Sequence, residues 1–129
     1  MKVTKGIDWI ITCTDNFEAT VAFFRDVMNL SIIAEGVPVV DTQFTRYALI
    51  RMPNGVSLEI VEPTSTARQL YDAPIVSITV ADLSQARLEM ERQQVEFVTS
   101  IFDDQAGWGW YYFRAPDNNI YQIQGPYQA

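Results

Sequence analysis

The chain has 129 residues, of which 48% are hydrophobic and 19% charged, so it is long enough for one compact domain and too short for two. A net charge of −7 disfavours nucleic acid as a partner. The sequence contains no histidine and only one cysteine, Cys13, which excludes histidine-dependent nucleophiles, zinc sites built from His or several Cys, and an internal disulfide. No apolar run is long enough to span a membrane, so we expect a cytoplasmic protein without membrane contact.

Hydrophobic spacing in the first half predicts a strand, a helix and three further strands. The expected strands cover residues 3–13, 30–36, 43–51 and 56–62. The helix is expected over 17–28, with Asn16 as its N-cap. Its core face consists of apolar side chains three and four residues apart: Val21, Phe23, Phe24, Val27 and Met28. Asn54 and Gly55 are expected to supply the positive φ angles of the last turn.

The same order of elements returns after a linker over residues 64–73. A strand over 74–80 is followed by a helix that Asp82 opens, and Gln85 completes a capping-box-like pair. The expected apolar side of this helix consists of Leu83, Ala86, Leu88 and Met90. Three more strands are expected near 95–102, 107–114 and 119–124.

The two halves are also similar to each other in amino-acid sequence. YALIRMPNGVSLEI matches WYYFRAPDNNIYQI at a shift of 63 residues, which aligns Glu59 with Gln122, and a shift of 66 aligns Asn16 with Asp82. Such self-similarity predicts a tandem architecture. We therefore predict a single domain over 1–129 that contains two βαβββ modules, at about 1–63 and 74–129.

The segments VAFFRDVMNL and RAPDNNIYQI, together with the repeat, resemble the vicinal oxygen chelate superfamily, which includes glyoxalases, bleomycin resistance proteins and extradiol dioxygenases. The resemblance covers about residues 5–125. It implies an α+β fold in which curled mixed sheets form a cleft. It also implies a homodimer, whose interface we expect at Val37 to Val40 and at the linker that carries Tyr71.

Enzymatic members of that superfamily hold a divalent metal with four side chains. The corresponding positions carry Trp9, Glu59, Ile75 and Gln122 in this sequence. Trp and Ile have no lone pair for a metal, and Gln offers only a neutral carbonyl oxygen. We therefore expect no metal site and no cofactor.

Strand alternation places these four positions on the cleft side of their sheets. The predicted ligand-binding residues are Trp9, Ile11, Tyr47, Glu59, Ile75, Ser77, Trp108, Trp110 and Gln122. Trp9 either stacks on a ligand or plugs the vacated metal position, and the aromatic strand over 108–113 is either structural or in contact with a ligand. Glu59 is either paired with Arg46 or Arg51, or used to orient a ligand amine or as a general base.

Two functions fit this pattern. The favoured one is a metal-independent protein of the bleomycin-resistance type, not an enzyme, that binds a small aromatic and possibly cationic molecule. The alternative is a lyase, isomerase or dioxygenase, either metal-free with Glu59 as catalytic acid or base, or with an atypical metal site whose oxygen ligands include Glu59, Gln122 and Glu62.

Overall fold

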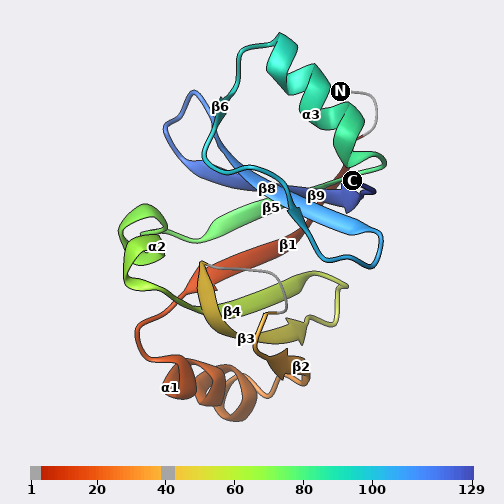
Figure 1. The fold of residues 1–129 in the computed structure, drawn as a ribbon. Coiled ribbons are helices and arrows are strands. Elements are labelled where there is room, and N and C mark those ends of the chain that lie inside the picture. The colour runs from red at the N-terminus through yellow and green to blue at the C-terminus, as the bar shows by residue number, and fades with distance from the viewer. Residues whose placement is uncertain (1–3, 39–42) are drawn as a thin grey trace. The chain divides into compact units, whose positions relative to one another are not determined.

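A computed structural model describes residues 4–38 and 43–129. The chain divides into two compact units, and each is described by itself (Figure 1). The first unit is Trp9–Ile75. The second unit consists of Val76–Ala129 and the N-terminal residues through Asp8. No helix of the described residues is long and apolar enough to cross a membrane.

The first unit contains a four-stranded mixed sheet in the order β2-β3-β4-β1. Its strands are β1 (Thr4–Cys13, of which the last five residues belong here), β2 (Ile32–Gly36), β3 (Phe44–Arg51) and β4 (Ser57–Pro63). Strand β1 is parallel to β4, whereas β2 and β3 continue the sheet antiparallel. Phe17 and Val21 of helix α1 (Phe17–Ala22) pack on one face of this sheet, against Ala48, Ile50 and Ile60.

The predicted helix over 17–28 changes form after its first turns. Residues Phe23–Val27 form a π-helical turn, η1, in which the Met28 amide donates to the Phe23 carbonyl five residues earlier. This wider turn breaks the 3.6-residue spacing on which the predicted core face depended. Val27 and Met28 are therefore 68% and 53% exposed, and Phe23 is 48% exposed, so their assignment to the core was wrong. Val21 and Phe24 pack against the core as predicted.

Local hydrogen bonds in the first unit correct three further predictions. Asn16 stands at the N-cap position, but its side chain makes no capping hydrogen bond. At the β3–β4 turn only Gly55 has a positive φ, and the Asn54 side chain instead accepts from the Val56 amide. The predicted linker contains a helix, α2 (Ser65–Leu70), whose N-cap Thr64 accepts from the backbone of Ala67.

The second unit repeats the plan, with strand order β5-β9-β8-β6 and β7 also paired to β8. Its elements are β5 (Ile75–Val80), α3 (Leu83–Arg92), β6 (Glu96–Phe97), β7 (Phe102–Asp103), β8 (Trp108–Arg114) and β9 (Ile120–Pro126). The strand expected near 95–102 is thus two short strands. Asp82 caps α3 through the Gln85 amide, as predicted.

Helix α3 covers one face of this second sheet. Its Leu83, Ala86 and Met90 are buried together with Tyr111 and Ile123, whereas Leu88, which the sequence had placed on the apolar side, is 49% exposed. The parallel pairs β1–β4 and β5–β9, each extended by antiparallel strands, confirm the predicted α+β fold of two tandem βαβββ modules.

Candidate functional site

Three rows of side chains cross the face of the first sheet that lies opposite α1. Residues that pair across neighbouring strands point to the same face of a sheet. The pairings join Trp9 to Ser57 and Arg51, Ile11 to Glu59 and Leu49, and Cys13 to Val61 and Tyr47. The predicted residues Trp9, Ile11, Tyr47 and Glu59 therefore share one surface, as strand alternation had indicated.

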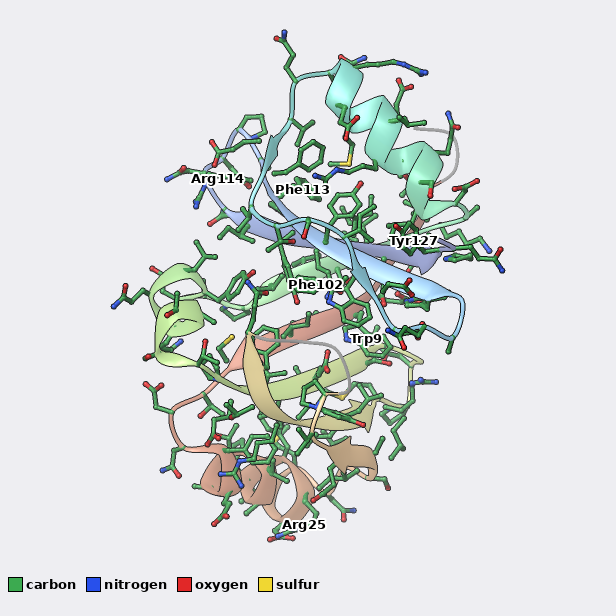
Figure 2. The ribbon with its side chains drawn as sticks, in the orientation of Figure 1. Trp9, Arg25, Phe102, Phe113, Arg114 and Tyr127 are labelled. Carbon is green, nitrogen blue, oxygen red and sulfur yellow. The ribbon has the colours of Figure 1, made fainter. Side chains whose placement is uncertain are left out.

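Trp9 and Glu59 form the polar centre of this surface. The Trp9 indole Nε1 donates a hydrogen bond of 3.1 Å to Glu59 Oε1, and both side chains are half-buried (Trp9 is labelled in Figure 2). The nearest cross-strand neighbours of Glu59 are the apolar Ile11, which is 1% exposed, and Leu49. The indole hydrogen bond therefore fixes the orientation of the Glu59 carboxyl group.

The two arginines considered as partners of Glu59 bond to other groups. Arg46 forms ion pairs with Glu62 at 3.1 Å and with Glu18 at 3.4 Å, and its guanidinium lies over the Phe17 ring. The side-chain hydrogen bond of Arg51 goes to Ser57 Oγ at 2.9 Å. Both arginines thus have a structural role in fixing β3 and β4.

Cys13 lies in the next row, and its thiol is expected to be a weak nucleophile. Burial raises the pKa of the thiol from 9.0 to about 11, and the Arg68 guanidinium only partly offsets that effect. A raised pKa lowers the fraction of thiolate, which is the reactive form. The higher pKa lowers the fraction of thiolate but makes each thiolate a stronger nucleophile, so the two effects partly cancel. We expect alkylation by iodoacetamide at pH 8 to be about tenfold slower than for an unfolded thiol.

The pH profile of this reaction gives a second check. The alkylation rate of the folded protein should still rise steeply between pH 10 and 11, whereas the same thiol in urea should level off above about pH 10. Equal rates and equal profiles in the two states would contradict the assignment of Cys13 as a half-buried, protonated thiol.

A chain of hydrogen bonds crosses the corresponding face of the second sheet, opposite α3. Trp108 Nε1 donates to Gln124 Oε1 at 3.1 Å, and Gln124 Nε2 donates to Ser77 Oγ at 3.0 Å. Ser77 in turn donates to Gln122 Oε1 at 2.6 Å, and Gln122 Nε2 donates to the Tyr112 hydroxyl at 3.1 Å. The three inner members, Gln124, Ser77 and Gln122, each donate one hydrogen bond and accept another, so this amide chain is well satisfied although four of its members are buried.

The amide chain should contribute to stability. In Gln122→Met, Ser77 loses its acceptor and Tyr112 loses a donor at a buried position of similar volume. We expect the free energy of unfolding to fall by about 2 kcal/mol, the usual penalty for an unsatisfied buried polar group. Urea denaturation measures the change, and the exposed Gln69→Met on α2 serves as the matched control, with an effect below about 0.5 kcal/mol. A fully stable Gln122→Met protein would refute this role.

Aromatic side chains border the amide chain on β8 and β7. The Trp110 ring stacks on Phe102, with centroids 5.9 Å apart and planes at 26°, and Phe102 also meets Tyr112 edge-on (Figure 2 labels Phe102). Trp108 and Trp110 are half-buried. Their contact with a ligand stays a prediction. Phe102, Tyr112 and Gln124 were absent from the predicted site set, although the alternation of β8 and β9 indicated the last two.

The side chains at the four positions that the family resemblance assigns to a metal do not suit a divalent ion. The Trp9 indole and the sec-butyl side chain of Ile75 offer no lone pair to a metal, Ile75 is 1% exposed, and both polar atoms of Gln122 are engaged in the amide chain. Only Glu59 supplies an anionic oxygen. Within residues 4–38 and 43–129, no group of three or more His, Cys, Asp or Glu side chains is placed to hold a metal.

The predicted dimer interface includes residues that differ in burial. Tyr71 is 1% exposed and its hydroxyl donates to Gln43, so this side chain belongs to the core of the first unit. Val37 is 74% exposed, and the expected interface residues 39 and 40 lie outside the described part of the chain. The homodimer stays a prediction.

Comparison with known proteins identifies the family. The model of the Glyoxalase/Bleomycin resistance protein/Dioxygenase superfamily matches residues 6–123. No curated protein sequence matches the chain significantly.

Solved structures show the same fold at low sequence identity. Methylmalonyl-CoA epimerase from Mycobacterium tuberculosis superposes with a TM-score of 0.77 at 16% identity, covering 98% of this chain and 91% of that one. A variant of methylmalonyl-CoA epimerase from Streptomyces coelicolor, in complex with 2-nitronate-propionyl-CoA, superposes with a TM-score of 0.72 at 16% identity. The match covers 97% of this chain and 99% of that one. A mutant 4-hydroxymandelate synthase from Streptomyces coelicolor superposes with a TM-score of 0.61 at 12% identity, over 98% of this chain and 49% of that one. From its paired βαβββ modules and the match over 6–123, the chain belongs to the glyoxalase, bleomycin resistance protein and dioxygenase superfamily.

Proposed function

We propose that the protein is an isomerase or lyase of this superfamily that moves a proton at a carbon atom next to a carbonyl group, with Glu59 as the acid–base residue and without a metal. The observation that carries the proposal is the Trp9–Glu59 hydrogen bond on the sheet face opposite α1. It favours the enzymatic alternative of the sequence analysis over pure ligand binding. The similar solved structures include proteins named as epimerases, which supports the same class of chemistry.

The physical argument rests on how Glu59 is held. A general base must be fixed within hydrogen-bond reach of the proton that it removes, and its carboxylate must not be fully hydrated. The β1–β4 pairing fixes the backbone of Glu59, the indole fixes one carboxylate oxygen, and Ile11 and Leu49 limit water around it. With Trp at one of the metal positions and a buried Ile at another, the carboxylate would act as a base and not as a ligand.

Exchange of a substrate proton for deuterium tests the proposal. Chelator-stripped protein would be incubated in D2O with a panel of 2-substituted acyl-CoA thioesters, beginning with methylmalonyl-CoA, and deuterium incorporation would be followed by mass spectrometry. We expect incorporation at the carbon beside the thioester carbonyl without added metal. Exchange that appears only when Mn²⁺, Fe²⁺, Ni²⁺ or Zn²⁺ is added, or micromolar binding of these ions by calorimetry, would overturn the metal-free mechanism.

A second candidate function is the binding of an aromatic or cationic molecule without turnover. Trp9 and Tyr47 lie on the same sheet face as Glu59, and aromatic rings with one carboxylate are the groups that recognise a cation. An aromatic ammonium compound without an indole, such as benzyltrimethylammonium, should then change Trp9 emission, and Trp9→Phe should remove that component. Binding in this assay together with no exchange from any thioester would favour this second function over the first.

A further inference from the structure

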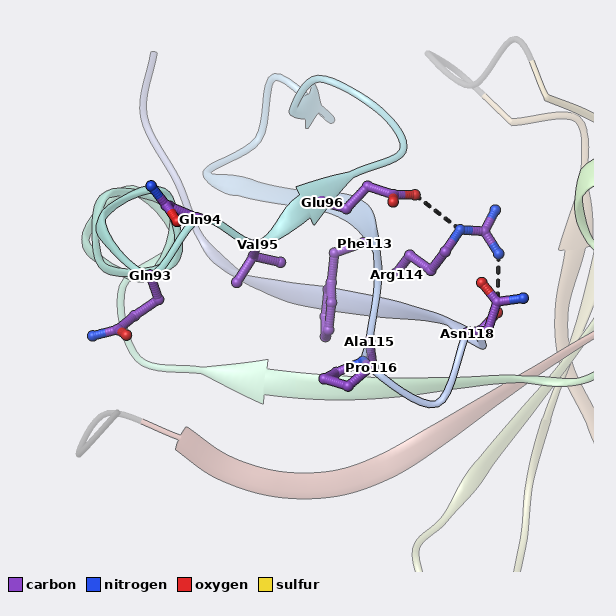
Figure 3. A pocket seen from close by; sticks show the side chains of 9 residues that line it. All are labelled: Gln93, Gln94, Val95, Glu96, Phe113, Arg114, Ala115, Pro116 and Asn118. Atoms are coloured by element: carbon purple, nitrogen blue, oxygen red, sulfur yellow. Dashed lines mark hydrogen bonds and ion pairs between the residues drawn. The ribbon is translucent and has the colours of Figure 1, made fainter.

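A hollow with a volume of about 400 Å³ lies in the second unit, where the C-terminal end of α3 meets β6 and the turn between β8 and β9 (Figure 3). No part of the proposed function uses it. Its apolar wall is built from Val95, Phe113, Ala115 and Pro116. Figure 3 shows the Phe113 ring edge-on between Val95 and Pro116. A volume of this order suits a small molecule.

The Phe113 ring is held in a fixed plane. It stacks on Tyr121, with centroids 5.8 Å apart and planes at 18°, and the Tyr121 hydroxyl donates to Asp117 at 2.7 Å. Phe113 also packs against the core cluster under α3. Tyr121 stacks on one side of this half-buried ring, so another planar ring would stack on the part of Phe113 that lines the hollow.

The two charged side chains that line the hollow form an ion pair with each other. Arg114 Nε donates to Glu96 Oε2 at 2.9 Å, and Arg114 Nη1 donates to the Asn118 carbonyl at 2.9 Å (Figure 3). Because Arg114 and Glu96 are paired with each other, a charged ligand would lose part of its hydration without meeting an unpaired opposite charge, and an anion would in addition meet the net charge of −7. The remaining polar side chains are the neutral amides of Gln93, Gln94 and Asn118, which can both donate and accept.

We infer that this hollow binds a neutral, planar heteroaromatic molecule, which stacks on Phe113 and exchanges hydrogen bonds with the amides at the rim. The Phe113 ring favours a flat aromatic ligand. The ion pair Arg114–Glu96 leaves no unpaired charge for a charged ligand, and the side-chain amides favour a ligand with hydrogen-bond donors and acceptors at its edge. The inference is independent of the proposed function because it uses none of the residues around Glu59.

Three probes of nearly equal shape separate ring stacking from charge: neutral nicotinamide, anionic nicotinate, and the cationic N-methylated pyridinium form of nicotinamide. Titration of ¹⁵N-labelled full-length protein would be followed by amide chemical shifts. We expect nicotinamide to bind with a Kd on the order of 1 mM, the range for so small a ligand, and to shift the amides of Val95, Ala115 and Asn118. The two charged probes should bind at least about fivefold more weakly.

Variants then assign the site. Phe113→Leu should weaken nicotinamide binding about tenfold because it removes the stacking ring. Phe24→Leu is the matched control, since Phe24 packs against the core cluster of the first unit and does not line the hollow, and it should keep its affinity within about twofold. If Phe113→Leu does not fold, Asn118→Gly serves instead, because Asn118 has a φ of 68° that glycine adopts freely. We expect it to bind about threefold more weakly through loss of one rim amide.

Several results would overturn the inference. These are equal affinities for the three probes, no shifts at several millimolar nicotinamide, shifts centred on Trp9 and Glu59, or unchanged affinity in both Phe113→Leu and Asn118→Gly. A protein that binds nicotinamide here but shows no thioester exchange would support this site and refute the proposed function separately.

Discussion

Replacement of Glu59 by Gln is expected to slow metal-free thioester exchange by about 100- to 10,000-fold, the range that a positioned general base contributes. The amide has nearly the same shape as the carboxylate, and its oxygen can still accept from the Trp9 indole. The change therefore removes the base and leaves the local packing unaltered. Deuterium incorporation under saturating thioester measures the effect, and the thermal midpoint reports that the fold is retained.

Two variants give this experiment its controls. Glu62→Gln removes another carboxylate of β4, which pairs with Arg46 and Thr45, and it should leave exchange within about twofold of the parent protein. Trp9→Phe removes the hydrogen bond but keeps a ring, and a loss of about tenfold is expected from the less fixed carboxylate. Full exchange activity in Glu59→Gln would show that another group removes the proton.

Gly125→Ala is expected to lower the free energy of unfolding by about 3 kcal/mol or more, and the thermal midpoint by about 10 °C. A Cβ atom at Gly125 would clash with the Val80 carbonyl oxygen and would lie 3.3 Å from its carbonyl carbon. Both residues are buried, and Val80 ends β5 just before helix α3, so the backbone has little freedom to move away. The added methyl group must therefore displace paired strands or leave their hydrogen bonds distorted.

Gly36→Ala is the matched control for this prediction. Gly36 also lies in a strand, but a Cβ atom there would meet the Tyr47 side chain at an ordinary distance of 3.7 Å, and its φ is not positive. We expect a change within about 0.5 kcal/mol. Equal thermal midpoints for Gly125→Ala and Gly36→Ala would mean that β9 does not approach the end of β5 as closely as described.

The sequence predicted features that depend on local spacing. Period-2 alternation put Trp9, Ile11 and Glu59 on one sheet face, and the internal repeat paired Glu59 with Gln122 in the two halves. These predictions hold because strand periodicity is fixed by the covalent geometry of the backbone. The same reasoning failed for Val27 and Met28, since one π-helical turn changes the phase of all the residues that follow it in a helix.

The chain's own sequence thus determined the order of elements, the faces of the strands and the membership of the superfamily. Only the tertiary structure decided that Glu59 accepts from Trp9, that Gln122 is bound into an amide chain with Ser77, and that a hollow forms beside Phe113. The bonded partners lie 50 and 45 residues apart in the sequence. Their hydrogen bonds depend on which strands pair and in what register, and this is set by the packing of the whole unit and not by any local pattern.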